Sequence, residues 1–243
     1  MNILETKNLS KHFDGVAAVD DLSIVIERGK ITSVIGPNGS GKTTLVNVLS
    51  GMLAKTSGTV MVDGVRARKL AASDVASYGI TRTFQEVRLF AQMPVLDNIL
   101  VALTERNVFG ALFEKHSALH LARTEELLKK VGLWEKRYEL AVNLSYGQRK
   151  LMEIARALAM NAEIYLLDEP FAGLFPEMVK TIVGIVKELR AEGKTVVLIE
   201  HNMDLIRELS GHVVVMDGGK LLAEGKPEVV LAEKKVVEAY LGE

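Results

Sequence analysis

A glycine-rich segment near the start of the chain has the residue types and spacing of a phosphate-binding loop. Residues 36–44 read Gly-Pro-Asn-Gly-Ser-Gly-Lys-Thr-Thr, which matches G-x-x-x-x-G-K-[ST]. Glycines let successive backbone N–H groups turn toward one point and form an anion nest at a helix N-terminus. The Lys42 ammonium adds charge for β- and γ-phosphates, and the Thr43 hydroxyl can bind Mg²⁺. A turn that only joins strand to helix is disfavoured by the apolar strand before it and the helical pattern after it. We therefore predict a nucleoside triphosphate site formed by Gly36, Pro37, Asn38, Gly39, Ser40, Gly41, Lys42, Thr43 and Thr44.

Two adjacent carboxylates follow an apolar run later in the chain. Residues 164–167, Ile-Tyr-Leu-Leu, lead directly into Asp168 and Glu169. Taken alone, such a pair is usually the solvated end of a strand. Beside a phosphate loop, however, Asp168 can hold Mg²⁺ and Glu169 can polarise an attacking water molecule. The sequence thus predicts a site that binds and hydrolyses a nucleoside triphosphate.

The clearest helix of the chain is expected over residues 147–160, where apolar residues recur at i, i+3, i+4, i+7 and i+8. Just before it lies the segment Asn-Leu-Ser-Tyr-Gly-Gln-Arg, residues 143–149. Ser145 and Gln148 have the spacing of a capping box, in which the hydroxyl accepts from an otherwise unpaired amide. Considered alone, the segment predicts a helix cap and nothing more.

Apolar strands alternate with amphipathic helices on both sides of a block, residues 95–160, that is mostly helical in pattern. This alternation predicts an α/β fold with a mainly parallel sheet covered on both faces, and a helical insertion. The expected strands are Leu4–Leu9, Leu22–Ile26, Ile31–Ile35, Thr59–Val62, Ile164–Leu167, Thr195–Ile199 and a hairpin from Val213 to Leu222. Further helices are expected over 42–51, 177–190 and 227–241.

Composition excludes several classes of protein. The chain has 243 residues, 48% hydrophobic and 25% charged, which excludes disorder and collagen-like repetition. The absence of cysteine excludes disulfides, thiolate zinc sites and a cysteine nucleophile. A net charge of −1 gives no general attraction for nucleic acid, and no nucleic-acid partner is expected. Neither a secretory signal nor a run of about 18 apolar residues is found, so we expect a soluble, intracellular protein.

The order of phosphate loop, Leu-Ser-Tyr-Gly-Gln and Asp-Glu strand resembles that of the ABC ATPases, whose signature reads Leu-Ser-Gly-Gly-Gln. The resemblance covers essentially all 243 residues. It implies one ABC nucleotide-binding domain over 1–243, with a P-loop NTPase (RecA-like) core, an N-terminal antiparallel β subdomain and an inserted helical subdomain at about 88–160. It also implies that the substrate is ATP bound with Mg²⁺.

The same resemblance assigns roles to further residues. It implies that Glu169 is the catalytic base and that His201, after the strand 195–199, contacts the γ-phosphate. Gln85, in the segment Arg-Thr-Phe-Gln, matches a glutamine that reaches Mg²⁺ and senses the transporter. Phe13 matches the aromatic residue that stacks on adenine. The signature residues that would meet the γ-phosphate bound to a second subunit are Ser145, Gly147 and Gln148.

One position and one segment depart from the family pattern. Tyr146 stands where the signature usually has glycine. After Pro170 the family commonly shows Ser-Ala-Leu-Asp, whereas residues 171–176 here read Phe-Ala-Gly-Leu-Phe-Pro. Because that loop crosses the dimer interface in the family, the departure affects communication between two ATP sites rather than the primary chemistry.

Within the family, the chain looks most like the ATPases of branched-chain amino acid importers. The Arg-Thr-Phe-Gln segment, the signature tyrosine and Ala-Gly-Leu-x-Pro at 172–176 all occur in that group. The end of the chain, 236–242, resembles both that group and lipopolysaccharide-export ATPases, and urea importers use a similar ATPase. A soluble ABC protein acting on nucleic acid and a small P-loop kinase are the rival classes.

The importer interpretation implies several partners. These are membrane permease subunits, a second ATPase subunit arranged head to tail and, indirectly, a solute-binding protein. It places the chain in the cytoplasm, peripheral on the cytoplasmic face of the membrane.

Overall fold

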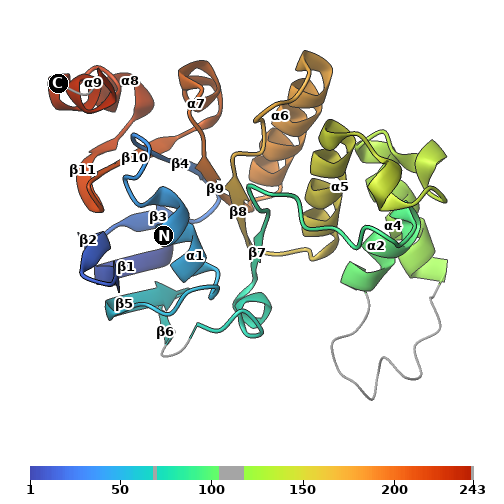
Figure 1. Ribbon diagram of the computed structural model, residues 1–243, viewed down its shortest axis with the longest axis horizontal. Coiled ribbons are helices and arrows are strands. Elements are labelled where there is room, and N and C mark those ends of the chain that lie inside the picture. The colour runs from blue at the N-terminus through green and yellow to red at the C-terminus, as the bar shows by residue number, and fades with distance from the viewer. Residues whose placement is uncertain (68–69, 104–117, 242–243) are drawn as a thin grey trace. The chain divides into compact units, whose positions relative to one another are not determined.

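The computed structural model describes residues 1–67, 70–103 and 118–241. The chain forms two compact units (Figure 1). Unit 1 comprises Met1–Arg82, Glu163–Pro170 and Val183–Glu243, and unit 2 comprises Thr83–Ala162 and Phe171–Ile182. Part of the helical block predicted at 95–160, residues 104–117, lies outside the described residues. Within the described residues, no helix has the length and apolar character needed to cross a membrane.

Unit 1 contains a six-stranded sheet in the order β11-β10-β4-β9-β8-β7. Neighbouring strands are parallel except for β10 and β11, which form an antiparallel hairpin. Every residue of β4, β8 and β9 is buried, as expected for a sheet covered on both faces. The prediction of a mainly parallel sheet is therefore confirmed. The strands are β4 (Ile31–Ile35), β7 (Ile80–Arg82), β8 (Ile164–Asp168), β9 (Thr195–Ile199), β10 (His212–Asp217) and β11 (Lys220–Gly225).

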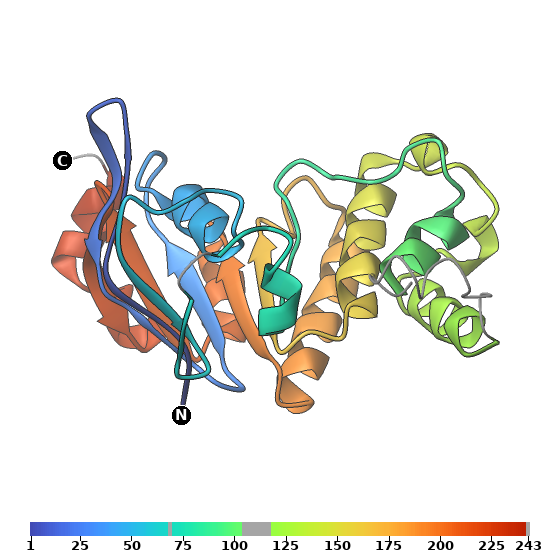
Figure 2. The ribbon, with the colours of Figure 1, turned by 90° about the horizontal axis from the view of Figure 1, so that it is seen from below.

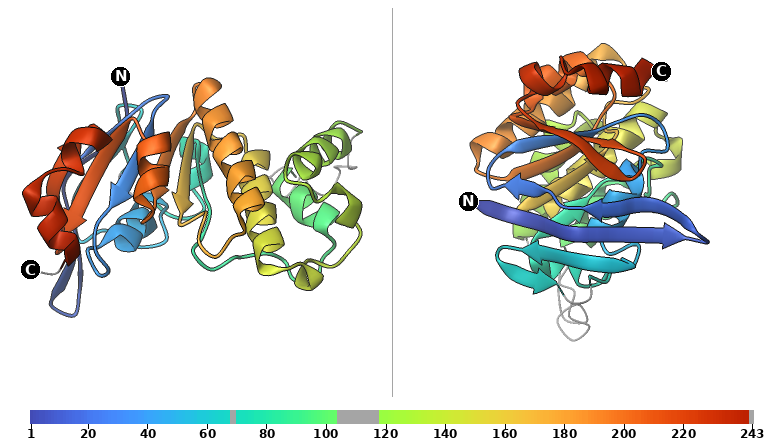
Figure 3. Two further views of the ribbon diagram at one scale, coloured as in Figure 1. Left: turned by 90° about the horizontal axis from the view of Figure 1, so that it is seen from above. Right: turned by 90° about the vertical axis from the view of Figure 1, so that its left-hand side faces the viewer.

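A second, antiparallel sheet is formed by the N-terminal part of the chain (Figure 3). Its order is β2-β1-β5-β6, and β3 also pairs with β1. The long β1 therefore lies in the middle of this sheet, as the view at the right of Figure 3 shows. The strands are β1 (Asn2–Phe13), β2 (Val16–Leu22), β3 (Val25–Glu27), β5 (Ser57–Val62) and β6 (Val65–Ala67).

The single strand predicted at Leu22–Ile26 is wrong, because β2 ends at Leu22 and β3 begins at Val25. The buried hydroxyl of Thr6 explains the break. It donates to the Leu22 carbonyl at 2.9 Å and accepts from the Ile24 amide at 3.0 Å. A side chain of β1 thus satisfies the backbone groups that a continuous strand would have paired.

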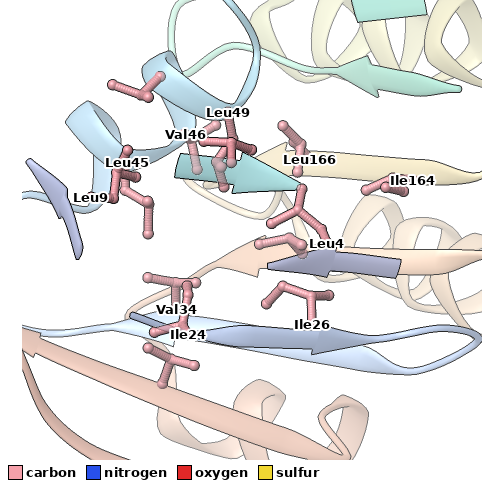
Figure 4. Close-up of a cluster of buried hydrophobic side chains, with 14 of the residues drawn as sticks. Leu4, Leu9, Ile24, Ile26, Val34, Leu45, Val46, Leu49, Ile164 and Leu166 are labelled. Atoms are coloured by element: carbon pink, nitrogen blue, oxygen red, sulfur yellow. The ribbon is translucent and has the colours of Figure 1, made fainter. Parts of the chain in front are cut away.

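The main hydrophobic core of unit 1 joins the two sheets and helix α1 (Lys42–Leu49) (Figure 4). Leu4 comes from β1, Val34 from β4, Leu166 from β8, and Leu45 and Leu49 from α1. Each is completely buried or nearly so, and burial of one such side chain contributes about 1.5–3 kcal/mol. This core fixes the direction of α1 and of the loop that precedes it.

Helices dominate unit 2 (Figure 2), where α2, α4 and α5 pack against one another. The helix predicted at 147–160 is confirmed as α5, and both hydrogen bonds of its capping box are present. The helix predicted at 177–190 is also confirmed, as α6, whose first turns belong to unit 2 and the rest to unit 1. The helices are α2 (Val95–Leu103), α4 (Ala118–Lys130), α5 (Tyr146–Ala159) and α6 (Pro176–Ala191), with short 3₁₀ turns at Trp134–Lys136 and Ala141–Asn143.

The single C-terminal helix predicted at 227–241 is wrong. The segment forms α8 (Pro227–Val230) and α9 (Lys234–Leu241) instead. Val230 and Val236 both pack into one cluster with Ile35 and Val213. Six residues apart, their side chains would lie about 120° apart around a straight helix, and the break lets both pack directly into the cluster. Unit 1 also contains α7 (Met203–Leu209) and a 3₁₀ turn at Val75–Tyr78.

Candidate functional site

The phosphate loop connects β4 to α1 and depends on two glycines for its path. Gly36 has φ +147°, and a Cβ there would lie 2.0 Å from the Met216 carbonyl oxygen. Gly41 has φ +98°, and its Cβ would lie 2.2 Å from the Ala18 carbonyl oxygen. Only glycine fits such close approaches of backbone to backbone. The β2 and β10 strands therefore fix the loop from two directions.

Two further contacts hold the loop from the C-terminal part of unit 1. The Gly219 amide, in the turn between β10 and β11, donates to the Ser40 carbonyl at 3.1 Å. The hydroxyl of Tyr240, from α9, accepts from the Gly36 amide at 2.8 Å. Tyr240 was not among the predicted site residues, and nothing in the sequence pattern joins it to a loop 204 positions away.

Lys42 lies inside the loop. Its ammonium donates to the carbonyl oxygens of Gly36 and Pro37, both at 2.8 Å. Burial lowers the pKa of Lys42, and the carboxylates of Glu169 and Asp168 oppose that shift. The ammonium is thus held by weak neutral acceptors that phosphate oxygens can replace with a stronger, charged contact. Thr43 is exposed at the positive end of α1, where it can meet an anion or its metal.

Asp168 ends β8 and forms a buried ion pair with Arg82, the last residue of β7. The guanidinium lies 2.9 Å from Asp168 Oδ2, and the two side chains are only 6% and 1% exposed. Arg82 also donates to Asn47 Oδ1 at 2.6 Å and to Ser50 Oγ at 2.9 Å. Arg82 thereby fixes the position of Asp168 relative to α1. The sequence predicts no role of its own for Arg82. Arg82 is nevertheless the first residue of the Arg-Thr-Phe-Gln segment, which is singled out because of Gln85.

Glu169 and His201 follow neighbouring parallel strands, and their side chains meet. His201 Nε2 lies 2.9 Å from Glu169 Oε1. Glu169 has φ +48°, a left-handed conformation that is uncommon for a residue other than glycine and is concentrated at functional sites. The backbone after β9 is held by Glu200, whose Oε1 accepts from the amides of His201 and Asn202 at 2.8 and 2.9 Å. The pair thus has the geometry of a base and its orienting partner.

Phe13 lies at the end of β1, where the chain turns into β2. Phe13 is 41% exposed, and the Lys11 ammonium lies 4.7 Å from the centroid of its ring. A cation above an aromatic face adds electrostatic attraction to a surface on which a planar ring can stack.

In unit 2, the Leu-Ser-Tyr-Gly-Gln segment forms the N-terminus of α5. The Gln148 amide donates to Ser145 Oγ at 3.3 Å, and Gln148 Oε1 accepts from the Ser145 amide at 3.0 Å. Gly147 is buried, and a Cβ there would lie 2.3 Å from Met178 Sδ. Tyr146 and the segment 171–176, which both depart from the family pattern, lie next to each other. A Cβ added at Gly173 would lie 3.3 Å from Tyr146 Cε1.

Gln85 belongs to a segment, residues 84–88, that we call the Gln85 segment. Gln85 is exposed and lines a groove of about 300 Å³ within unit 2. Other residues lining the groove come from the N-terminal part of α5 and the 3₁₀ turn before it, among them Ala141, Val142, Tyr146 and Arg149. The predicted residues thus form two groups. In unit 1 the phosphate loop, Asp168, Glu169 and His201 are linked by contacts or electrostatic interactions. In unit 2 Gln85 shares a groove with Tyr146 of the signature.

The oxygen donors of these groups suit Mg²⁺. A hydroxyl from Thr43 and a carboxylate from Asp168, both in unit 1, are hard ligands of the type this ion prefers. The buried Arg82–Asp168 pair also keeps that carboxylate in a fixed orientation. The residues present therefore fit the metal that a nucleoside triphosphate carries.

Comparison with known proteins gives two matching family models. Residues 19–172 match the model described as ABC transporter, and residues 220–243 match one described as branched-chain amino acid ATP-binding cassette transporter. The probable branched-chain amino acid transport ATP-binding protein LivG of Archaeoglobus fulgidus is 38% identical over 100% of this chain and 96% of its own length. The high-affinity branched-chain amino acid transport ATP-binding protein BraF of Pseudomonas aeruginosa is 39% identical over 99% of this chain and 98% of its own.

Solved structures agree with these sequence matches. A nucleotide-free ATP-binding cassette from an ABC transporter superposes with a TM-score of 0.88 at 36% identity, covering 100% of both chains. An ATP-binding cassette solved as a dimer in a post-hydrolysis state, bound to ADP and Pi, gives a TM-score of 0.81 at 27% identity. That match covers 93% of this chain and 99% of the other. The predicted P-loop core with an antiparallel β subdomain and a helical subdomain is thereby confirmed.

Proposed function

The chain belongs to the ABC transporter family of ATP-binding cassettes, and from this premise we propose that it is the ATPase that drives uptake of branched-chain amino acids through partner permeases. Members of this family bind and hydrolyse ATP to power transport. The match of residues 220–243 to the branched-chain amino acid cassette model carries the choice of solute, because it covers a segment beyond the general ABC match. Relatives with that transport named cover almost the whole chain.

Hydrolysis uses the residues gathered in unit 1. The backbone amides of residues 36–44 bind the β- and γ-phosphates, and Lys42 exchanges its contacts with Gly36 and Pro37 for phosphate oxygens. The Glu169 carboxylate takes a proton from the attacking water, and His201, 2.9 Å away, orients that carboxylate and contacts the γ-phosphate. Thr43, Asp168 and Gln85 would hold Mg²⁺, which would supply positive charge at the phosphate oxygens when bound. Phe13 stacks on the adenine ring.

A second ATPase subunit completes the site. The dimeric relative bound to ADP and Pi supports this arrangement. In a head-to-tail pair, Ser145, Gly147 and Gln148 of one subunit face the γ-phosphate on the other. The Ser145 hydroxyl accepts from the Gln148 amide, so its own proton remains to be donated to a phosphate oxygen. Phe175, 76% exposed in the loop after Pro170, reaches the same interface.

Permease subunits contact the groove of unit 2 that Gln85 lines. It is formed by a loop and a helix end, and Leu89, Ala91 and Val142 give it an apolar part beside Glu86 and Arg149. A permease segment with a matching apolar face can fill a space of about 300 Å³. The chain acts as one nucleotide-binding domain over 1–243, peripheral on the cytoplasmic face of the membrane. A solute-binding protein is an indirect partner, and we expect no nucleic-acid partner.

Purification of the tagged chain from detergent-solubilised membranes of its host tests this proposal. Two permeases and a second, distinct ATPase are expected, and the purified complex should hydrolyse ATP faster with a branched-chain amino acid and its binding protein. A homodimer with lipopolysaccharide-export permeases, or stimulation by urea, would contradict the assigned solute. Repeated recovery without any membrane protein would contradict the role in transport.

The chemistry is tested separately with Glu169→Gln. This variant should bind ATP with wild-type affinity but hydrolyse it at least 100-fold more slowly, because an amide cannot accept the proton of the attacking water. Release of inorganic phosphate measures the rate. Wild-type turnover by the variant would exclude Glu169 as the base.

A further inference from the structure

Three charged side chains of α5 lie along one side of the helix and are directed at a loop rather than at solvent. Lys150, Glu153 and Arg156 are spaced at i, i+3 and i+6, which places neighbours on adjacent turns of one face. Lys150 is 2% exposed and Glu153 is 5% exposed. Charged residues are seldom buried so completely unless they have specific partners. We call these three residues the α5 clamp.

The partners are backbone groups at the two ends of the Gln85 segment. At Phe84, the amide donates to Glu153 Oε1 at 3.1 Å, and the carbonyl accepts from the Lys150 ammonium at 3.3 Å. At Arg88, the amide donates to the same Glu153 oxygen at 3.5 Å, and the carbonyl accepts from the Arg156 guanidinium at 2.6 Å. Both backbone groups of both flanking residues are therefore held by α5.

Aromatic contacts reinforce this attachment. The Arg88 guanidinium lies 4.2 Å from the Phe84 ring centroid, so the two ends of the segment also contact each other. The Arg156 guanidinium lies 5.1 Å from the centroid of Phe90, two residues further on. Residues 85–87, between the two held ends, line the groove of unit 2.

Burying the charged side chains of the α5 clamp costs free energy, so the clamp is not the most stabilising way to attach a loop. Burial raises the pKa of Glu153 to about 7, and its second oxygen, Oε2, has no hydrogen-bond partner within the described part of the chain. A well-packed apolar side chain at such a position is often at least as stabilising as a buried charge. An apolar side chain, however, offers no acceptor, whereas a single Glu153 oxygen receives two backbone amides of the neighbouring loop. The geometry thus favours a role in positioning.

We propose that Glu153, assisted by Lys150 and Arg156, is a positioning residue that joins the Gln85 segment to α5, so that Gln85 and the signature at the start of α5 move as one rigid element. Any partner that enters the groove between them then displaces both together. The functional consequence rests on the proposed function, in which Gln85 serves the magnesium site. The attachment itself does not depend on that function.

Site-resolved amide hydrogen exchange, measured by NMR on the full chain, tests the attachment directly. Glu153→Leu keeps the buried volume but removes the acceptor, and should raise exchange at the Phe84 amide at least 10-fold. Glu153→Gln retains an amide oxygen that can accept from Phe84, and should stay within threefold of wild type. Ile154→Val, a neighbouring buried residue of α5, is the matched control and should leave Phe84 protected.

The functional consequence is measured through the dependence of ATP hydrolysis on Mg²⁺. Glu153→Leu should raise the Mg²⁺ concentration for half-maximal rate at least fivefold, while the maximal rate and the affinity for ATP without Mg²⁺ change less than twofold. Ile154→Val should leave all three unchanged. A purely structural role for Glu153 would instead lower the amount of folded protein without moving the Mg²⁺ dependence.

Each result decides one question. Unchanged exchange at Phe84 in Glu153→Leu, or an equal rise in Ile154→Val, would overturn the clamp. Faster exchange with an unchanged Mg²⁺ dependence would overturn its link to Gln85. A wild-type chain that hydrolyses no ATP would contradict the proposed function, while the exchange data would still decide on the clamp. If Glu153→Leu does not fold, Lys150→Met serves in its place, with an expected threefold rise in exchange at Phe84.

Discussion

The phosphate loop of unit 1 and the Gln85 segment of unit 2 both follow a strand, yet different kinds of contact hold them in place. Close approach of backbone to backbone fixes the phosphate loop, with glycines at Gly36 and Gly41 where any Cβ would collide with a carbonyl oxygen. Buried charged side chains of α5 fix the Gln85 segment by binding its backbone at Phe84 and Arg88. Steric exclusion therefore holds the phosphate loop in place, whereas hydrogen bonds from charged side chains hold the Gln85 segment.

This difference suits the two tasks that we propose. A phosphate nest needs amides fixed to within a fraction of an ångström, which close packing provides. A segment that transmits the approach of a partner must stay attached to its helix while keeping its outer side open. Side-chain contacts from one side meet that need, because Gln85 remains exposed beside the groove.

Among the variants that test this difference between the two segments, Gly36→Ala should have the largest effect. The new Cβ would lie 2.0 Å from a backbone oxygen, so the loop must move, and ATP affinity should fall at least 100-fold. Gly64→Ala is the control, because Gly64 also has positive φ but nothing within 4 Å of its Cβ position. Equilibrium binding of a fluorescent ATP analogue measures both variants. Equal affinities would show that sterics do not fix the loop.

Arg82→Met tests the buried ion pair between Arg82 and Asp168 beside the phosphate loop. Removing the guanidinium breaks a buried ion pair on the side of Asp168, which should lower the free energy of unfolding by about 3–5 kcal/mol. Arg28→Met removes an ion pair with Asp63 whose side chains are 33% and 59% exposed, and should cost at most about 1 kcal/mol. Urea unfolding compares the two. Similar losses would mean that Arg82 is not a structural anchor of the site.

The sequence signals that predict the chemistry are local. The phosphate loop, the carboxylates after β8 and the capped start of α5 each lie within a few consecutive residues, and the strand and helix around each were predicted with them. The meeting of Glu169 and His201 also follows from local signals, since both residues come directly after neighbouring parallel strands. The mainly parallel sheet followed from alternating apolar strands and amphipathic helices.

The errors and omissions have a common cause, which is dependence on distant contacts. The break between β2 and β3 requires the hydroxyl of Thr6 from another strand, and the break between α8 and α9 requires a shared cluster. The role of Glu153 has no local signal in the sequence, because its partners lie 65 to 69 positions away. No periodic pattern contains such information.

A change of pH should have a smaller effect on the free energy of unfolding, through Glu153 of unit 2. Because burial raises the pKa of Glu153 to about 7 in the folded chain, against 4.5 as its ordinary value, folding favours the protonated acid. The free energy of unfolding should therefore fall as pH rises from about 4.5 to 7 and then level off, a loss of about 3 kcal/mol from this group. In Glu153→Gln this contribution is absent, so the variant should gain stability relative to wild type between pH 5 and pH 8. Urea unfolding at several pH values measures the difference, and a constant difference across the range would contradict the assignment.

The smallest effect is expected where a single side chain supplements the steric control of the phosphate loop. Tyr240→Phe removes the hydroxyl that accepts from the Gly36 amide but keeps the ring within the cluster of Val213 and Val236. The loss of one neutral hydrogen bond should lower the free energy of unfolding by about 1 kcal/mol. Nucleotide affinity should change by less than threefold, because the glycine contacts remain. The control is Tyr78→Phe, since Tyr78 is half-buried in unit 1 and its hydroxyl has no hydrogen bond within the described residues. A tenfold loss of ATP affinity in Tyr240→Phe alone would show that the C-terminal helix, and not close packing, sets the conformation of the loop.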